Sequence, residues 1–454
     1  MKKYLYPNKI ILFYCTILFW TALLSSQTLL WRQLPNSPVS IGGGGRFDDV
    51  FFINANTGWI IDPSFRLGTH PGRVLKTING GLNWIVQIDT GHAYYRCIGF
   101  ADSLNGWIGT IGDADSAAID TTLFYRTIDG GTSWAKITNI TGPWPKGICG
   151  LCVVNTSIIY ACGRYSSPAH FLKSTDGGAT WISKDMSAYA SRLIDCYFYS
   201  PTSGFVTGGI GSTYSNSKGI VLFTSDGGEN WVNRFTTSDT SQWGWKISFP
   251  SVNTGYVSLE KEHPPGPCYF LKTTDGGVTW EQKQFMNNYY DEEGVGFVND
   301  NTGWIRGWSG PTFVTTNGGI SWQLANFGNY INRFRFLNDT LAYAVGYNVY
   351  MYSRYPIGIE PISTTIPVKY LLFQNYPNPF NPSTNIKFNL PNSSFTKLIV
   401  YDALGKELVT LVNEQLNAGT YEANWNASNF SSGLYFYKLT VENYTDTRKM
   451  LLVK

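Results

Sequence analysis

Charged residues are scarce in this chain, and neither sign dominates. Lys, Arg, Asp and Glu make up 14% of the 454 residues, and the formal net charge is +3. Soluble domains average about 25% charged residues, so the chain is poor in them. Because there is no basic excess to pair with a polyphosphate, the composition argues against a dedicated nucleic-acid binder. No window sustains a heptad pattern, which excludes coiled coils and long helices.

Recognised catalytic and metal-ligand spacings are also missing. Cys149-x-x-Cys152 has the spacing of half a zinc site, but no second pair follows and the four histidines are scattered. No G-x-S-x-G or H-E-x-x-H sequence occurs, and the arginine phrase of a sialidase is absent before the first repeat. We therefore predict no metal, no cofactor and no catalytic residue.

The one long apolar run lies at the N-terminus. Ile10–Leu24 is apolar, three lysines precede it at positions 2, 3 and 9, and small residues follow it. A membrane span needs about 20 residues, so this run is short for one. The pattern is typical of a secretory signal peptide, and we predict one over residues 1–26, leaving no transmembrane anchor after processing. An uncleaved anchor is the alternative.

Six cysteines remain once Cys15 leaves with that peptide. An even number in an exported chain is compatible with disulfides. The spacing leaves two possibilities open, namely a bridge between Cys152 and Cys162 across one hairpin, or buried free thiols.

Aromatic residues and glycine are abundant, with 16 Trp, 29 Tyr, 27 Phe and 47 Gly. This composition is typical of many short strands joined by tight turns. One phrase occurs six times at a spacing of 42 to 50 residues: Thr77-Ile-Asn-Gly-Gly-Leu-Asn-Trp84, Thr127-Ile-Asp-Gly-Gly-Thr-Ser-Trp134, Ser174-Thr-Asp-Gly-Gly-Ala-Thr-Trp181, Thr224-Ser-Asp-Gly-Gly-Glu-Asn-Trp231, Thr273-Thr-Asp-Gly-Gly-Val-Thr-Trp280 and Thr315-Thr-Asn-Gly-Gly-Ile-Ser-Trp322. Such a period with several strands per unit predicts the blades of a β-propeller.

The number of blades is predicted by a second repeated phrase. Two aromatic or apolar anchors seven residues apart, as in Phe52…Asn56-Thr-Gly-Trp59, occur seven times and predict an inner hairpin in each blade. Because only six Gly-Gly phrases accompany seven hairpins, one outer strand must come from elsewhere. Residues 30–34 resemble the strand that follows each phrase, so we predict that they close the ring beside residues 349–353.

The repeated carboxyl and amide residues are predicted to be structural. An Asp or Asn at this position accepts hydrogen bonds within its own turn, and the two glycines adopt backbone angles that other residues avoid. Catalysis needs groups that converge on one place, whereas these occur once in each blade. The six residues are Asn79, Asp129, Asp176, Asp226, Asp275 and Asn317.

These phrases resemble those of the Asp-box (BNR) propellers, which include sialidases, sortilins and oligoxyloglucan-type glycosidases. The combination of "NTGW" with "TTDGGxTW" is most similar to photosystem II assembly/stability factor-like propellers. The resemblance covers about residues 31–354. It implies the fold, but not a function, because such turns lie away from the central channel.

A different composition begins after the last repeat. Residues 355–366 contain Pro356 and Pro361 among Ser and Thr, and we predict a linker there. Six strand-like runs follow within residues 367–454, which predicts a small antiparallel β-sandwich. The whole chain is therefore expected to be all-β, with a seven-bladed propeller over residues 27–354 followed by that sandwich.

The C-terminal region resembles a type A sorting domain of the type IX secretion system. The matching stretches are "QNYPNPFNPSTNIKFNLP", "VYDALGKEL", "AGTYEANWNASNFSSGLYFYKL" and "KMLLVK". The resemblance implies that residues 367–454 are recognised by the type IX machinery. The passenger is then expected to be secreted or attached to the outer cell surface.

Loops that lead into the innermost strands carry the candidate binding residues. They lie together at one end of the ring, and aromatic faces beside mixed charges suit sugars or peptide segments. The residues are Tyr94, Tyr95, Arg96, Trp144, Asp195, Trp243, Trp245, Lys246, Tyr289, Tyr290, Glu293, Arg333 and Arg335. The alternative is that the aromatic residues pack between blades as core.

The sequence thus favours an exported, non-enzymatic propeller that binds a glycan or protein partner. One alternative is a glycoside hydrolase of the Asp-box class, which needs two carboxylates about 5–10 Å apart. Asp49, Asp195 and Glu293 are the only residues that offer such a pair. A second alternative is a factor that assists a membrane complex, and predicted export from the cell argues against it.

Overall fold

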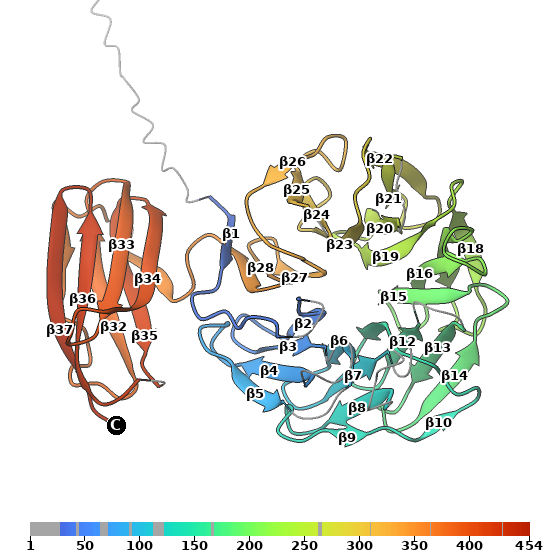
Figure 1. Ribbon diagram of the computed structural model, residues 1–454, viewed down its shortest axis with the longest axis horizontal. Coiled ribbons are helices and arrows are strands. Elements are labelled where there is room, and N and C mark those ends of the chain that lie inside the picture. The colour runs from blue at the N-terminus through green and yellow to red at the C-terminus, as the bar shows by residue number, and fades with distance from the viewer. Residues whose placement is uncertain are drawn as a thin grey trace, which may run out of the picture.

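The described part of the chain is built from β-strands, which form a ring of sheets and a separate C-terminal body (Figure 1). The computed structural model describes residues 28–41, 45–63, 71–89, 93–111, 122–164, 168–261, 266–308, 310–363, 365–428 and 430–454. Within these ranges there is no helix that could cross a membrane. The predicted all-β fold of a propeller followed by a sandwich is confirmed. The predicted signal peptide lies outside the described residues.

Seven sheets stand around a common centre, and we number them as blades 1–7 along the chain (Figure 1). Blade 1 contains β2 (Asp49–Phe52), β3 (Gly58–Asp62), β4 (Arg73–Thr77) and β5 (Ile85–Ile88). Blade 2 contains β6 (Tyr95–Phe100), β7 (Gly106–Thr110), β8 (Phe124–Thr127) and β9 (Ala135–Lys136). Blade 3 contains β11 (Gly150–Val153), β12 (Ile159–Gly163), β13 (His170–Ser174) and β14 (Trp181–Asp185), with β10 (Ile140–Thr141) added in parallel at its outer edge.

The next blades repeat the same order of four antiparallel strands. Blade 4 contains β15 (Arg192–Phe198), β16 (Gly204–Ile210), β17 (Lys218–Thr224) and β18 (Val232–Thr236). Blade 5 contains β19 (Gln242–Ser248), β20 (Gly255–Lys261), β21 (Cys268–Thr273) and β22 (Glu281–Met286). Blade 6 contains β23 (Glu292–Phe297), β24 (Gly303–Gly307), β25 (Thr312–Thr315) and β26 (Gln323–Ala325).

Blade 7 joins the two ends of the ring. It contains β27 (Arg333–Asn338), β28 (Leu341–Val345) and β29 (Val349–Ser353), and its fourth strand is β1 (Leu30–Gln33) from the start of the chain. β1 pairs antiparallel with β29, from Leu30 opposite Ser353 to Gln33 opposite Tyr350. Residues 30–34 were predicted to lie beside residues 349–353, and these two strands do so.

The glycine of the second repeated phrase is required because an aromatic ring packs directly against it. A Cβ atom on Gly58 would lie 2.5 Å from the ring of Phe52, and one on Gly303 would lie 2.3 Å from the ring of Phe297. Both distances are far below van der Waals contact, so only glycine lets the first anchor fold back onto its own hairpin. This packing explains why the phenylalanine and the glycine recur together at a fixed spacing.

The first repeated phrase forms a closed turn of hydrogen bonds. In blade 2 the Asp129 carboxylate accepts hydrogen bonds from the Thr127 hydroxyl at 2.8 Å and the Ser133 backbone N–H at 2.9 Å. The Thr127 hydroxyl in turn accepts one from the backbone N–H of Gly131 at 2.8 Å. The two glycines, Gly130 and Gly131, have φ of 70° and 89°. Equivalent bonds occur in the other five turns.

These turns make the ring sensitive to acid. The hydroxyl and backbone N–H of Ser133 lower the pKa of Asp129 to about 2, and Asp176, Asp226 and Asp275 are held at about 2 in the same way. An unfolded carboxyl titrates near 3.8. The ionised turns therefore stabilise the fold above about pH 4, and this contribution is lost as the pH falls toward 2.

Replacing all four aspartates by asparagine should flatten this dependence on pH. The turns with Asn79 and Asn317 show that an amide fits the same position. We expect the urea midpoint of the natural chain to fall between pH 4 and pH 2.5, and that of the fourfold Asp→Asn chain to fall less, because no carboxylate is left to take up a proton there. Parallel curves for the two chains would show that these turns do not cause the acid sensitivity.

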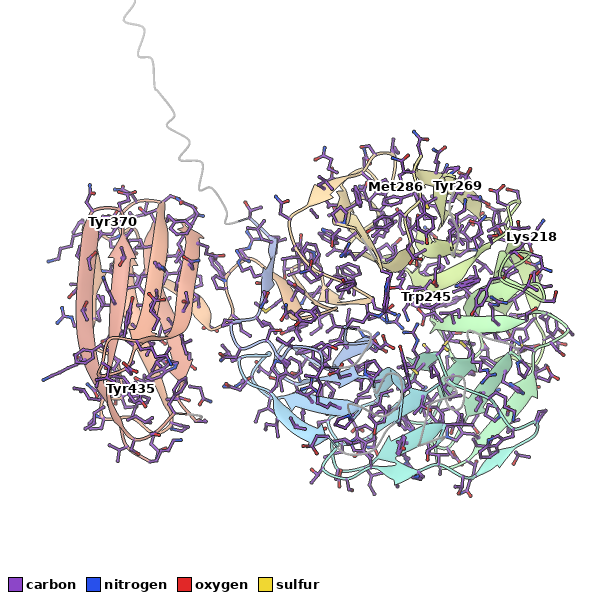
Figure 2. The ribbon with its side chains drawn as sticks, in the orientation of Figure 1. Lys218, Trp245, Tyr269, Met286, Tyr370 and Tyr435 are labelled. Carbon is purple, nitrogen blue, oxygen red and sulfur yellow. The ribbon has the colours of Figure 1, made fainter. Side chains whose placement is uncertain are left out.

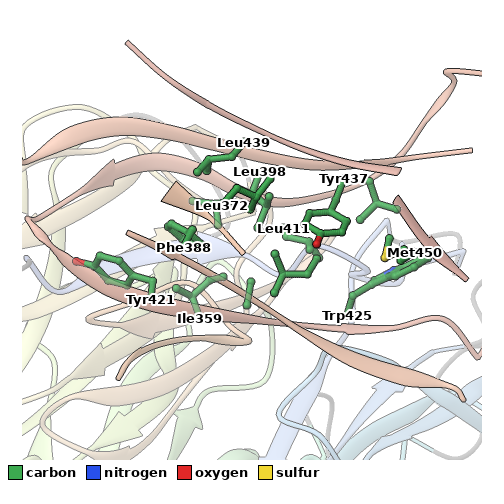
Figure 3. Packing of buried hydrophobic residues seen from close by; sticks show 14 of the residues in the cluster. Ile359, Leu372, Phe388, Leu398, Leu411, Tyr421, Trp425, Tyr437, Leu439 and Met450 are labelled. Atoms are coloured by element: carbon green, nitrogen blue, oxygen red, sulfur yellow. The ribbon is translucent and has the colours of Figure 1, made fainter. Parts of the chain in front are cut away.

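The C-terminal body is a sandwich of two four-stranded sheets. One sheet has the order β30-β35-β32-β31 and the other the order β34-β33-β36-β37. The first contains β30 (Ile359–Ser363), β31 (Leu371–Leu372), β32 (Ser383–Leu390) and β35 (Gly419–Asn426), and the second contains β33 (Ser394–Tyr401), β34 (Glu407–Leu416), β36 (Gly433–Val441) and β37 (Tyr444–Leu452). Buried side chains from both sheets, including Leu398, Trp425 and Leu439, fill the space between them (Figure 3).

Residues 355–366, predicted as a linker, contain a strand in the structure. Its middle part forms strand β30, which pairs with β35, and Ile359 is 4% exposed in the sandwich core (Figure 3). Pro361 is tolerated because β30 lies at the edge of its sheet, where a missing N–H leaves no ladder bond unmade. We therefore propose that the sandwich begins at residue 359 and that the connection is shorter than predicted.

Candidate functional site

The innermost strand of each blade begins at one end of the ring, and we call this end the ring mouth. In blades 2, 4, 5 and 6 an inserted residue interrupts the pairing of this strand near its start. The inserted residues include Arg96, Lys246 and Glu293. Such a bulge redirects a side chain that regular pairing would send elsewhere. Several predicted site residues owe their position in the centre to this irregularity.

Charged side chains from the blades meet in the centre of the ring. We call them the central charged cluster, and they are Arg46, Asp48, Asp49, Arg96, Asp195, Lys246, Glu293 and Arg333. All except Arg333, which is half-buried, are buried. Trp245 lies beside them near the centre of the ring (Figure 2).

Arg333 joins three blades. Its guanidinium binds both oxygens of Asp195 at 2.9 and 3.1 Å, and its Nε lies 3.1 Å from Asp49 Oδ1. The same carboxylates accept backbone N–H bonds from Ile247 and Ile98. Burial raises the pKa of Asp195, but the charges of Arg333 and Lys246 and the hydrogen bonds from Arg333 and Ile247 together hold the pKa below the ordinary value. Both carboxylates are therefore fully engaged within the ring.

A second set of pairs surrounds Asp48. Arg96 lies 2.9 Å from one oxygen of Asp48, and Arg46 lies 3.1 Å from the other. Arg46 also pairs with Glu293 from blade 6. Burial raises the pKa of Asp48, and the two guanidinium groups more than offset this and lower it. These carboxylates are paired acceptors and do not form a free acid–base pair.

Aromatic side chains at the ring mouth remain open to solvent. Trp308 lies under the guanidinium of Arg46 at 4.5 Å, and its ring centroid is 6.0 Å from that of Tyr330. Arg306 lies 6.0 Å from the Tyr330 ring on the other side. Tyr330 is 39% exposed, and Trp144, on the loop before blade 3, is 50% exposed. The mouth thus offers the aromatic faces of Tyr330 and Trp144, while the guanidinium groups of Arg46 and Arg306 are buried beside the Trp308 and Tyr330 rings.

Four of the predicted aromatic residues are not part of this exposed surface. Trp243 is 2% exposed, Trp245 7%, Tyr290 5% and Tyr95 2%. The Trp243 ring packs on Tyr214 and the Trp245 N–H donates to Asn332 at 3.1 Å, so these rings are core. For these four residues the alternative stated above, that the aromatic residues pack as core, is what the structure shows.

The other predicted residues divide into two groups. Tyr94, Tyr289 and Trp144 are half-buried or exposed and belong to the ring mouth. Arg96, Asp195, Lys246, Glu293 and Arg333 are brought together in the central charged cluster, and Arg335 lies beside it over the Phe51 ring at 4.2 Å. The turn residues from Asn79 to Asn317 lie on the turns between the third and fourth strands of their blades.

Sequence reasoning missed Arg46, Asp48, Trp308 and Glu260. Arg46 and Asp48 precede the first repeated phrase, and Trp308 follows the second strand of a blade, so none occupies a recurring position. Glu260 accepts a hydrogen bond from Trp243 Nε1 at 2.9 Å. Burial, with help from Glu293, raises the pKa of Glu260 well above its ordinary value. No sequence pattern marks Glu260.

The described cysteines are all free thiols, so the bridge between Cys152 and Cys162 is not formed. Burial is the main cause that raises the pKa of Cys152 to about 12, which keeps this thiol protonated and unreactive. Across the ranges that the structure describes, no three Cys, His, Asp or Glu side chains group as metal ligands.

Comparison with known families identifies the C-terminal region. Residues 374–454 match the family model of the secretion system C-terminal sorting domain. This match points to export by the type IX system, to interaction with its machinery and to a cell-surface or secreted location. No curated protein matches the chain significantly in sequence.

Comparison with solved structures identifies the fold of the ring. The chain is similar to YCF48 bound to D1 peptide, with a TM-score of 0.51 and 16% identity over 72% of this chain and 95% of that chain. It is also similar to YCF48 from Cyanidioschyzon merolae, with a TM-score of 0.51 and 15% identity over 71% of this chain and 99% of that chain. At this level of identity the likeness shows a shared propeller fold.

Proposed function

We propose that this chain is an exported, non-enzymatic propeller that binds a glycan or protein partner at the cell surface through its ring mouth. The observation that carries the proposal is the row formed by Arg306, Tyr330, Trp308 and Arg46. In this row the Trp308 ring is half-buried and the Tyr330 ring is exposed, whereas the two guanidinium groups beside them are buried. Tryptophan and tyrosine are among the residues that dominate binding energy in interfaces. A solved YCF48 holds a D1 peptide, which supports a peptide as one kind of partner.

The paired carboxylates support a binding role over a catalytic one. A glycosidase needs one carboxyl that gives a proton and one that is free to attack or to activate water. Asp49 and Asp195 share Arg333, and Glu293 pairs with Arg46, so each is tied to a guanidinium. A positioned arginine occupies the oxygens of such a carboxylate.

One observation keeps a glycoside hydrolase as a second candidate. Burial raises the pKa of Glu260 and the nearby charge of Glu293 raises it further, which is one way in which a carboxyl is kept as an acid. Under the binding proposal, the full chain releases no reducing sugar from any glycan that it binds. Release that disappears in the Glu260→Gln chain would favour the hydrolase.

Replacing Trp308 by alanine should weaken partner binding at least about 30-fold, because a central aromatic anchor contributes about 2 kcal/mol or more. The partner is first selected by probing the full chain against glycan and peptide arrays, and its affinity is then measured by titration calorimetry. Val252→Ala is the matched control, since Val252 is 86% exposed on a turn at the opposite end of the ring. Equal weakening by both changes, or array binding that survives loss of Trp308 unchanged, would contradict the proposal.

A further inference from the structure

Lys246 differs from the other cations of the central charged cluster because its ammonium group has no hydrogen-bond acceptor among the described residues. Its side chain is buried, with 1% exposure, and Nζ has no hydrogen-bond partner among the described residues. An ammonium group is a donor of three hydrogen bonds, and burying it unpaired is strongly unfavourable. A fold that retains such a group needs an acceptor that the chain itself does not supply.

A β-bulge in the backbone directs the Lys246 side chain to the centre of the ring. The pairing of β19 with β20 jumps from Gly244 opposite Leu259 to Ile247 opposite Val257, so Trp245 and Lys246 together face one residue, Ser258, in a bulge with one extra residue. The Lys246 backbone N–H donates to the Ser258 hydroxyl at 3.1 Å, which holds the bulge in place. Bulges of this kind redirect side chains at functional sites.

The charged groups around Lys246 come from four other blades. Arg333 and Arg96 repel its ammonium group, while Asp195 and Asp49 attract it. Asp195 and Asp49 are already bound by Arg333. Asp48, whose carboxylate also interacts with Lys246, is bound by Arg96 and Arg46. Burial, together with the two arginines, lowers the pKa of Lys246 to about 8. Three cationic side chains therefore converge while their nearest carboxylates are engaged.

We propose that Lys246 anchors an internal binding site for a small anion in the centre of the ring, between Arg96 and Arg333. The anion accepts hydrogen bonds from the ammonium group and reduces the repulsion among the three cations. Trp245 lies against Arg96 at 4.9 Å and its indole N–H donates to Asn332, so this ring is fixed beside the arginine. This site is separate from the aromatic residues of the ring mouth.

Bromide locates such a site directly, because it substitutes for other small anions and scatters anomalously. Crystals of the full chain soaked in sodium bromide should show an anomalous peak at hydrogen-bond distance from Lys246 Nζ. A bromide map without a peak at this position overturns the proposal.

Anion-dependent stability gives a second readout in solution. At constant ionic strength, balanced with a bulky sulfonate, bromide or formate should raise the melting temperature by roughly 3–5 °C at 100 times its Kd. The Lys246→Met chain should lose this rise, whereas the Lys272→Met control, whose lysine instead donates to the Gly318 carbonyl at 2.8 Å, should keep it. A rise that persists in Lys246→Met also overturns the proposal, and the bromide map remains decisive if that chain fails to fold.

Discussion

Deleting residues 27–36 should lower the stability of the propeller by several kcal/mol. The deletion removes β1, leaves β29 as an open edge and takes away Trp31. The Trp31 ring stacks on Phe327 at 5.0 Å and contacts Trp304 edge-on at 5.5 Å, so it fills the space between blades 6 and 7. Loss of a core tryptophan alone costs about 3–5 kcal/mol.

Single substitutions on the same strand separate packing from strand loss. Trp31→Ala should account for a large share of the destabilisation in urea unfolding. Leu30→Ala should change little, because Leu30 lies beside it in β1 but is 50% exposed. An unchanged melting temperature after the deletion would show that the N-terminal strand does not close the ring.

The repeats made the fold predictable because each repeated residue has a local reason. Phe52 needs Gly58 beneath its ring, and Asp129 needs the two glycines of its turn. These requirements act within about eight residues, so they recur in every blade and are visible in one sequence. Closure of the ring by residues 30–34 could be expected for the same reason, because seven hairpins with only six Gly-Gly phrases leave one blade without its outer strand.

The site was less predictable because its residues depend on contacts between blades. Trp243 and Trp144 occupy similar positions in the sequence, yet one is buried against Tyr214 and the other is exposed. No local pattern distinguishes them. The bulge that directs Lys246 to the centre is equally invisible, because one inserted residue leaves the composition of a strand unchanged.

The error at residues 355–366 has a different origin. Prolines suggested a linker, but a proline at the edge of a sheet costs no ladder bond, and Pro361 lies on such an edge. Whether a strand lies at an edge depends on the order of the strands in space. The sequence of β30 alone does not contain that information.

A chain that ends at Arg354 should keep a folded propeller but fail to reach the cell surface. It retains all seven ring sheets, because β29 ends at Ser353, and it lacks the region that matches a sorting domain. One contact between the bodies is the ion pair between Arg32 and Glu414, and a partly exposed pair contributes about 1 kcal/mol or less. The truncation also removes Ile357, a single partly buried side chain that packs against the propeller core. Melting of the propeller should therefore change little.

The most direct test of the account is protease accessibility of a tag on the propeller in intact cells that carry the type IX system. The full chain should be cleaved from outside, and the chain ending at Arg354 should be protected until the outer membrane is opened. The Glu414→Ala chain, which loses the ion pair between the bodies but keeps the sandwich, should still be cleaved from outside. Surface cleavage of the chain that ends at Arg354 would contradict the assignment of the C-terminal region as the export address.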